Sequence, residues 1–367
     1  MMNTPCETLL GKSLPGSKKT GFWKITEKIE RRLDGTGGTF SVCYLAEHDD
    51  GTKAFVKATD IGLLTRFQSE DALSKMEKAI NEQNFERKIL DICRGNNLDR
   101  IVHAIDYGQI ETVFNGVKDI IFYIMFERAN GDVRAQMSRE QRASTSWCLC
   151  AMHNLSVAIQ QLHRESIAHN DIKPSNFLIF DQYLQKLADL GRATSDITSG
   201  PWDKIPYSGD FDYAAPEFWY RSEKPSSEYK KVPFPVRRAS DLFHLGSMGF
   251  FLMTGEKLSP LMRTYLRPEH NSLNWRGSFE DVLPFLRDAF GKSMSLFDQE
   301  LPRDRKENLL QESIAFRTAV MQLCEVDPHR RGHPLNAAGN QDPYALDRFI
   351  SIFDSNRKTL RMKELMA

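Results

Sequence analysis

The feature that most constrains the fold is a change of hydrophobic pattern about one third of the way along the chain. Before it, apolar residues form short strand-like runs, and after it they recur at helical spacing. The strand-like runs are Phe40–Ala46, Lys53–Lys57 and Ile120–Phe126. One long helix is expected among them, at Glu70–Cys93. The polar segment Glu127–Asp132 contains a glycine and separates the two patterns, so we expect an α+β chain in two lobes.

The chain after this segment is expected to be mainly helical. Amphipathic helices are predicted at Ser146–His163, Asp241–Met253, Phe279–Phe290, Ile314–Cys324 and Pro343–Phe353. The stretch 221–238 carries prolines, serines and a Lys/Arg cluster, and it is expected to be an exposed insert. Residues 1–20 are expected to be a flexible N-terminal tail, and residues 356–367 a C-terminal tail. The strand-rich lobe would then be 21–129 and the helical lobe 130–355.

The composition favours a globular protein in a reducing compartment. Of the 367 residues, 41% are hydrophobic, and 49 Lys and Arg balance 49 Asp and Glu, so the net charge suggests neither nucleic acid nor an anionic membrane. The 6 cysteines are too sparse for a disulfide scaffold and lack the spacing of zinc ligands. The N-terminal residues hold no apolar run, and the longest apolar stretch, Met248–Met253, is far below the about 20 residues that a membrane helix needs. We expect a soluble, cytoplasmic protein without a signal peptide or membrane span.

The strongest local signal is the segment Ala168–Leu178, which reads AHNDIKPSNFL. Within it, Asp171 is followed by Lys173 and then by Asn176. An Asp-Leu-Gly that begins at Asp189 comes next, after an apolar strand-like run. Phosphoryl transfer uses these residue types, because it needs a carboxylate for the attacking hydroxyl, a cation near the moving phosphoryl group and oxygen ligands for a metal ion.

The first lobe carries a glycine-rich turn and, in the strand-like run that follows it, a lysine. Glycine lets backbone N–H groups approach a phosphate without an intervening Cβ atom. The glycines of the turn LDGTGGTFSVC are Gly35, Gly37 and Gly38. Lys57 ends the strand segment AFVK, and the long helix offers it two carboxylates, Glu86 and, one turn earlier, Glu82.

Three further motifs follow the Asp-Leu-Gly segment. Ala-Ala-Pro-Glu ends at Glu217, Ser-Asp-Leu-Phe-His-Leu-Gly contains Asp241, and Asp-Pro-His-Arg-Arg ends at Arg331. Each motif alone occurs by chance, but the whole set in this order resembles the landmarks of eukaryotic-type (Hanks-type) protein kinases over about residues 25–340. The resemblance implies a two-lobed fold, with a small β-rich N-lobe that holds one long helix and a larger, mainly helical C-lobe. It also implies an ATP- and Mg²⁺-dependent serine/threonine kinase that acts on protein substrates.

The resemblance also implies a role for each landmark residue. Asp171 would orient the acceptor hydroxyl, and Lys173 would stabilise charge on the γ-phosphoryl group. Asn176 and Asp189 would hold Mg²⁺. Asp241 would brace the backbone of the catalytic loop.

For ATP, the resemblance implies that Lys57, held by Glu86, binds the α- and β-phosphates beneath the glycine-rich turn. The residues expected around the adenosine are the gatekeeper Phe126, the backbone of Glu127 and Ala129, Leu178 below the ring and Asp132 near the ribose. The resemblance further pairs Arg331 with Glu217 as a structural contact.

The chain departs from the family pattern at several positions. Asn170 replaces the arginine that commonly precedes the catalytic aspartate and meets an activation-loop phosphate. We therefore hypothesise that activity does not depend on phosphorylation of the activation loop, whose hydroxyls are Thr194, Ser195, Thr198 and Ser199. Asp210 replaces the usual threonine, Phe55 replaces a small alanine, and Ser41 and Cys43 replace a glycine and a valine of the nucleotide loop.

Two other functions are compatible with parts of the pattern. A pseudokinase that acts as a scaffold would explain the altered glycine loop, Phe55 and Asp210. Against it, the chain retains all five residues that catalysis needs, namely Lys57, Glu86, Asp171, Asn176 and Asp189. A small-molecule kinase of the aminoglycoside or choline type would share the catalytic loop, but the later motifs favour a protein substrate.

Overall fold

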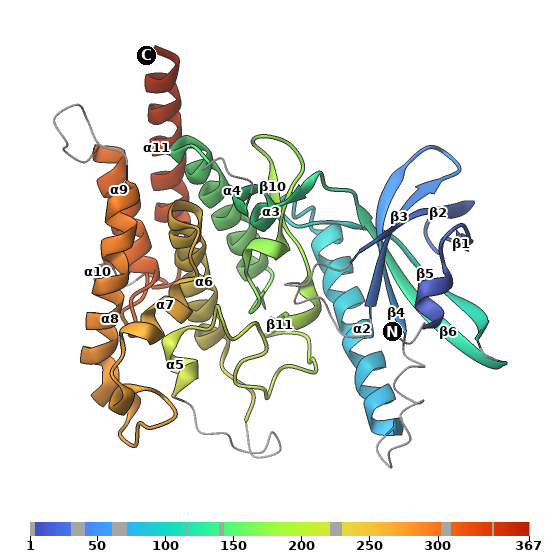
Figure 1. The fold of residues 1–367 in the computed structure, drawn as a ribbon, viewed down its shortest axis with the longest axis horizontal. Helices are drawn as coiled ribbons and strands as arrows, with labels where there is room; N and C mark the ends of the chain where they lie inside the picture. Colours follow the sequence, from blue (N-terminus) through green and yellow to red (C-terminus); the bar gives the residue numbers. More distant parts are fainter. Residues whose placement is uncertain are drawn as a thin grey trace. The chain divides into compact units, whose positions relative to one another are not determined.

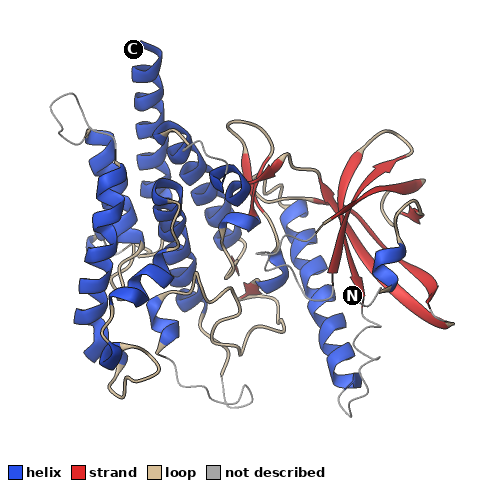
Figure 2. Cartoon of the chain, in the orientation of Figure 1, coloured by secondary structure: helices blue, strands red, loops and turns tan. Residues whose placement is uncertain are grey.

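In the computed structural model of the chain, the residues described are 4–30, 41–60, 72–114, 116–138, 143–220, 230–301, 310–339 and 341–366. Residues 1–97 and 102–129 form one compact unit, and residues 98–101 and 130–367 form another. The first unit holds most of the strands and one long helix, and the second is mainly helical (Figures 1 and 2). The α+β class expected from the hydrophobic pattern is confirmed.

The first unit is built on an antiparallel sheet with strand order β1-β2-β3-β4-β6-β5. Its elements are η1 (Pro5–Thr8), β1 (Ser13–Pro15), β2 (Phe22–Ile29), β3 (Ser41–His48), β4 (Lys53–Asp60), α2 (Ala72–Gly95), β5 (Ala104–Phe114) and β6 (Val117–Glu127). The three predicted strands correspond to β3, β4 and β6, and the predicted long helix is α2. Cys43 of β3 lies directly across from Lys57 of β4.

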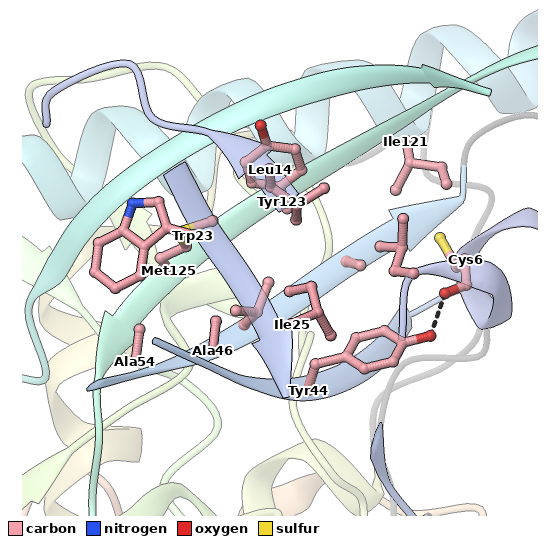
Figure 3. Close-up of a cluster of buried hydrophobic side chains, with 13 residues drawn as sticks. Cys6, Leu14, Trp23, Ile25, Tyr44, Ala46, Ala54, Ile121, Tyr123 and Met125 are labelled. Carbon is pink, nitrogen blue, oxygen red and sulfur yellow. Dashed lines mark hydrogen bonds between the residues drawn. The ribbon is translucent and has the colours of Figure 1, made fainter. Parts of the chain in front are cut away.

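One face of this sheet is covered by the N-terminal segment, so the expectation of a flexible tail at 1–20 is wrong. Trp23, Tyr44 and other side chains of β2, β3, β4 and β6 form a buried cluster that includes Cys6, Leu9 and Leu14 (Figure 3). These three N-terminal side chains are completely buried. The Tyr44 hydroxyl also donates to the carbonyl of Cys6. A few well-spaced apolar side chains thus anchor a segment whose overall composition is polar.

A buried carboxylate fixes the end of this segment. Asp106 of β5 is completely buried, and its Oδ1 accepts hydrogen bonds from the backbone N–H groups of Ser17, Lys18 and Tyr107. Its Oδ2 accepts from the indole N–H of Trp23 at 2.9 Å. Burial alone would raise the pKa of Asp106, but these hydrogen bonds outweigh burial and lower it.

The second unit packs helices around two small sheets. Its helices are α3 (Val133–Ser138), α4 (Thr145–Arg164), α5 (Pro216–Trp219), α6 (Phe234–Thr254), α7 (Leu258–Tyr265), α8 (Phe279–Glu300), α9 (Gln311–Leu323), α10 (Pro334–Ala338) and α11 (Asp347–Met366), with short 3₁₀ turns η2 (Pro174–Asn176), η3 (Leu190–Arg192) and η5 (Pro268–His270). Its strands are β7 (Gly131–Asp132), β8 (Ile167–Ala168), β9 (Phe177–Ile179), β10 (Gln185–Leu187) and β11 (Thr194–Ser195), paired as β10-β9-β7 and β11-β8.

Two expectations about this unit are wrong. Residues 356–366 of the expected C-terminal tail are instead part of α11, where Leu360 is buried and Lys363 pairs with Glu312 at 2.7 Å. The described part of the expected insert at 221–238 is not all exposed, because α6 already begins at Phe234 and Arg237 is buried. Proline is tolerated in the first turn of a helix, so this proline-rich sequence can begin one.

Within the described ranges, none of the helices combines the length and apolarity needed to cross a membrane. The 6 cysteines form no disulfide with one another.

We predict that Asp106→Asn destabilises the protein by about 1–3 kcal/mol at pH 7, because an amide cannot accept all of these hydrogen bonds. Because folding lowers the pKa of Asp106, its contribution is present above the pKa of the unfolded chain and is lost as pH falls through the folded value. Denaturant unfolding should therefore show a difference between variant and wild type that shrinks as the solution is acidified. The matched control is Asp288→Asn, whose carboxylate is exposed on α8. Equal effects of the two substitutions would contradict the prediction.

Candidate active site

The first unit places a lysine and a carboxylate in contact. Lys57 Nζ on β4 lies 3.1 Å and 3.4 Å from the two carboxylate oxygens of Glu86 on α2. Glu86 is buried on the same helix face as Ile89 and Leu90, three and four residues later. The apolar stripe of α2 therefore turns Glu86 toward the sheet. The alternative carboxylate, Glu82, lies one turn earlier in the helix.

The strand position two residues before Lys57 carries a larger side chain than the family pattern expects. Phe55 points to the same face of the sheet as Lys57, two residues along β4. Its ring contacts that of Phe126 on β6, with centroids 6.5 Å apart. At the end of β6, the side chain of Glu127 accepts a hydrogen bond from the backbone of His103 at 2.8 Å.

The other residues expected near ATP are spread over several positions. Ala129 is the last residue of the first unit and is half-buried. In the second unit, Leu178 of β9 lies across from Asp132 of β7. Asp132 itself accepts from the backbone of Ala135 at 2.7 Å, as an N-cap residue does. The predicted glycines Gly35, Gly37 and Gly38 lie outside the described residues.

The second unit gathers the residues of the predicted catalytic loop. Asp171 Oδ2 lies 2.9 Å from Lys173 Nζ and 3.2 Å from Asn176 Nδ2. Asp171 Oδ1 accepts from the backbone N–H of Asp210 at 2.8 Å. The Asp210 carboxylate lies 3.7 Å from Lys173, so the ammonium lies between two carboxylates. Both oxygens of Asp171 are therefore held in defined directions.

His169 connects this loop to Asp189. Its Nε2 donates to the carbonyl of Ala188 at 3.0 Å, while its Nδ1 accepts from the backbone of Asp171 at 3.2 Å, so the ring is neutral. Burial lowers the pKa of His169 in agreement with this state. Ala188 also donates to the carbonyl of Asn176 at 2.8 Å. Asp189 follows with a left-handed backbone, at φ +64°.

The donor set of Asn176 and Asp189 fits a magnesium ion. Asn176 uses its amide N–H group to donate to Asp171, both to the carbonyl at 2.9 Å and to the carboxylate. This leaves the amide oxygen as the group that can ligate a cation. An amide oxygen and a carboxylate are the hard oxygen ligands that Mg²⁺ prefers.

A buried carboxylate on α6 holds the backbone of the catalytic loop. Asp241 accepts from the N–H groups of His169 at 2.8 Å and Asn170 at 2.9 Å. Its Oδ2 also lies 3.0 Å from Nε2 of His163. Burial alone would raise the pKa of Asp241, but the imidazole groups of His163 and His244 outweigh burial and hold it far below its usual range. The histidines were not singled out as site residues from the sequence.

Asn170 binds the following segment directly. Its backbone is left-handed, at φ +63°, a conformation that asparagine tolerates better than most residues. Its side-chain N–H₂ group donates to the carbonyl of Arg192 at 3.0 Å and to the hydroxyl of Thr194 at 3.1 Å. Thr194 and Ser195 are buried. An amide thus occupies the place where the family pattern has an arginine.

Residues at the start of α6 and just before it hold the rest of that segment. The guanidinium of Arg237, only 2% exposed, donates to the carbonyls of Trp202, Ile205 and Pro206. Lys231 donates to the carbonyl of Ser195 at 3.0 Å. Two members of the basic cluster therefore bind backbone carbonyls of this chain.

The predicted pair between Glu217 and Arg331 forms. Two parallel hydrogen bonds of 2.8 Å and 2.9 Å join them, and both side chains are buried. Arg331 also donates to the carbonyls of Ala239 and Glu325. Burial alone would lower the pKa of Arg331, but Glu217 raises it. The pair connects α5 to the loop after α9.

We predict that Arg331→Met lowers the free energy of unfolding by about 3–5 kcal/mol, because it leaves Glu217 buried without its cation. The double variant Glu217→Gln/Arg331→Met should recover part of this loss, since it removes both charges. Arg287→Met is the control, because Arg287 is 39% exposed and its pairs with Glu325 and Asp327 should contribute about 0–1 kcal/mol. Equal losses in Arg331→Met and Arg287→Met, measured by denaturant unfolding, would refute a special role of the buried pair.

Residues 35–338 match the protein kinase domain family. The Dictyostelium discoideum protein named "probable serine/threonine-protein kinase" is 24% identical over 86% of this chain and 55% of its own length. Serine/threonine-protein kinase SBK1 of Danio rerio is 31% identical over 54% of this chain and 49% of its own length. Dual specificity protein kinase TTK of Mus musculus is 28% identical over 51% of this chain and 20% of its own length. The matched segment thus spans about half or less of these curated relatives.

The family match covers most of the chain, and the motifs predicted to carry the resemblance lie within it. The strand-rich unit with its one long helix and the larger helical unit agree with the two lobes of that fold. The chain therefore belongs to the protein kinase family.

Proposed function

We propose that this kinase transfers the γ-phosphate of ATP, with Mg²⁺, to serine or threonine hydroxyls of protein substrates. The observation that carries the proposal is the cluster of Asp171, Lys173 and Asn176, whose functional groups lie within 3.2 Å of the Asp171 carboxylate. These are the carboxylate, cation and amide that phosphoryl transfer requires. We propose the cytoplasm as its location, since none of its cysteines pairs with another in a disulfide.

Asp171 would accept a hydrogen bond from the attacking hydroxyl and take its proton as the new O–P bond forms. Its two oxygens are already oriented by Asp210, Lys173 and Asn176, so the carboxylate need not reorganise during the reaction. Lys173 would then offset negative charge on the transferred group. Positioning and electrostatics supply most of the acceleration in this class of reaction.

The nucleotide contacts are proposed from the family pattern. Lys57, held by Glu86, would bind the α- and β-phosphates, and the glycines Gly35, Gly37 and Gly38 would approach the phosphates through their backbone N–H groups. Asn176 and Asp189 would hold Mg²⁺, which neutralises phosphate charge when bound.

The adenine would meet backbone groups of Glu127 and Ala129, with Leu178 against the ring. Phe55 and Phe126 lie on the face of the sheet that carries Lys57, and their rings are in contact. Phe55 is far larger than the alanine of the family pattern, so we expect a shallow adenine site. ATP analogues with bulky substituents on the base should bind poorly.

Serine/threonine specificity is supported by Lys173, two residues after Asp171, and by the names of two relatives. Another relative is named as a dual specificity kinase. Asp210 stands where serine/threonine kinases commonly have threonine, and its carboxylate faces Lys173 as a threonine hydroxyl would. Phosphoamino-acid analysis of labelled substrate separates these specificities.

We predict that Asp171→Asn lowers kcat for phosphate transfer by about 10²- to 10⁴-fold or more, because the amide cannot accept the proton. Lys57→Met should impair transfer as well, since it removes the phosphate contact. The measurement is transfer of radiolabelled phosphate from ATP with Mg²⁺ to generic protein substrates, with Asp288→Asn as the control. Wild-type protein that binds ATP but transfers nothing would support a pseudokinase, and transfer only to small alcohols would support a small-molecule kinase.

We also propose that the kinase is active without phosphorylation of its activation segment. Asn170, Arg237 and Lys231 already bind its backbone or hydroxyl groups, so a phosphate is not required to fix it. Thr194 and Ser195 are buried, which keeps them from a modifying enzyme.

We predict that phosphatase-treated protein keeps its kcat within about twofold, whereas Asn170→Ala lowers kcat about tenfold, because the lost amide hydrogen bonds contribute about 1 kcal/mol each. Ser199→Ala, at an exposed position of the same segment, is the control and should behave as wild type. Loss of activity on phosphatase treatment, measured with the same transfer assay, would rule the idea out.

A further inference from the structure

Next to Asp241 on α6, a row of polar groups leads to residue 210 and has no role in the function proposed above. The row begins at His244, one turn after Asp241, and continues to the half-buried Tyr207, in the segment before α5. Asp241 and His244 are completely buried, and the Tyr207 ring packs against Phe218 with centroids 5.0 Å apart. Burying a polar group costs free energy unless it is hydrogen-bonded, so the hydrogen-bond partners of these groups indicate what the groups hold in place.

The proton positions along this row follow from counting donors and acceptors. The Tyr207 hydroxyl lies 2.9 Å from the carbonyl of Asp210, which can only accept, so the hydroxyl donates its single proton there. The same hydroxyl lies 3.2 Å from Nε2 of His244. With its own proton already used, the hydroxyl must accept from His244, which therefore carries a proton on Nε2. The other ring nitrogen, Nδ1, lies 3.9 Å from Oδ1 of Asp241, which is beyond hydrogen-bond distance, so His244 is fixed by its buried place on α6.

Asp241, one turn before His244 on α6, is itself held rigidly. Its oxygens accept from the backbone of His169 and Asn170 and from Nε2 of His163. His163 in turn accepts at Nδ1 from Arg238 at 3.4 Å, so it is a neutral ring with its proton directed at Asp241.

Residue 210 is where the row reaches the catalytic carboxylate. Its carbonyl is bound by Tyr207, while its N–H donates to Asp171 Oδ1 at 2.8 Å. The neighbouring Gly209 lies so close to the catalytic loop that a Cβ atom there would be 2.2 Å from the carbonyl of Asn170. A shift of residue 210 would therefore move the hydrogen bond that orients Asp171.

The groups that face His244 come from several elements. Asp241 lies on its own helix, and Tyr207 comes from the segment before α5. Asp171, Asp210 and Glu217 carry the other charges near Tyr207, and with burial they raise the pKa of its hydroxyl well above the usual value. The hydroxyl therefore remains protonated and able to donate to residue 210.

We propose that His244 and Tyr207 are positioning residues, which tie residue 210 to helix α6 and so orient Asp171 toward the acceptor hydroxyl. Helix α6 would then hold the catalytic loop twice, directly through Asp241 and indirectly through His244 and Tyr207. The inference rests on the proposed function for its effect on rate, but not for its effect on structure. A small displacement of a catalytic group can lower a rate by up to about 100-fold.

The test compares four variants in the phosphate-transfer assay. Tyr207→Phe removes only the hydroxyl and keeps the ring against Phe218, and His244→Leu removes the donor. Each should lower kcat about tenfold and leave KM for ATP within about twofold of wild type. The double variant should be no slower than either single variant, because both act through one chain of hydrogen bonds. His244→Gln, which keeps a side-chain N–H donor, should recover most of the rate.

Tyr220→Phe is the matched control, because the Tyr220 hydroxyl also donates to a carbonyl, that of His270, and has no hydrogen bond to the catalytic loop. Its kcat should equal that of wild type. Thermal unfolding of every variant separates a general loss of stability from a loss of rate. Wild-type kcat in Tyr207→Phe, or rate losses that multiply in the double variant, would overturn the proposal.

A second measurement does not depend on activity. The amide N–H of Asp210 should exchange slowly with solvent in wild type and faster in Tyr207→Phe, but not in Tyr220→Phe. Unchanged exchange at residue 210 would overturn the relay even in an active enzyme. If the wild type transferred no phosphate, the proposed function would fail, and the exchange measurement would still decide whether Tyr207 positions residue 210.

Discussion

The catalytic loop depends on one buried carboxylate. Asp241 gives its two oxygens to the backbone N–H groups of His169 and Asn170, immediately before Asp171. A completely buried carboxylate without partners would be costly, so these hydrogen bonds and the contact with His163 stabilise the charge and the loop together. The position of Asp171 therefore depends on α6, a helix most of whose residues are buried.

The segment after Asp189 is also held by hydrogen bonds from side chains of this protein. In the family pattern, an arginine at this position binds the phosphate of a phosphorylated activation loop. Here Asn170 instead donates hydrogen bonds to a carbonyl and a hydroxyl of the segment, and these bonds need no phosphate. Arg237 and Lys231 place their charges against backbone carbonyls of the same segment. Cations that are already engaged in this way leave the segment little need for an added negative charge.

Much of the fold and site could be predicted from local pattern. Asp171, Lys173 and Asn176 lie within six residues of one another, so their spacing alone predicts that they share a loop. The prediction of an N-terminal tail was wrong because it rested on the polar overall composition of residues 1–20. Three apolar side chains of this segment, Cys6, Leu9 and Leu14, are spaced so that all of them enter the buried cluster. His163 and His244 gave no signal, because a lone histidine on a helix is ordinary until its partner is known.

The sequence by itself determined the class of the fold, the order of the motifs and the chemical types at the site, since these depend on residues close together in the chain. Only the tertiary structure decided which polar groups meet away from water, such as Tyr207 with His244 or Trp23 with Asp106. Such partners come from elements 37 and 83 residues apart. Their pairing depends on tertiary packing that removes water from both groups at once, and a local sequence pattern does not predict that packing.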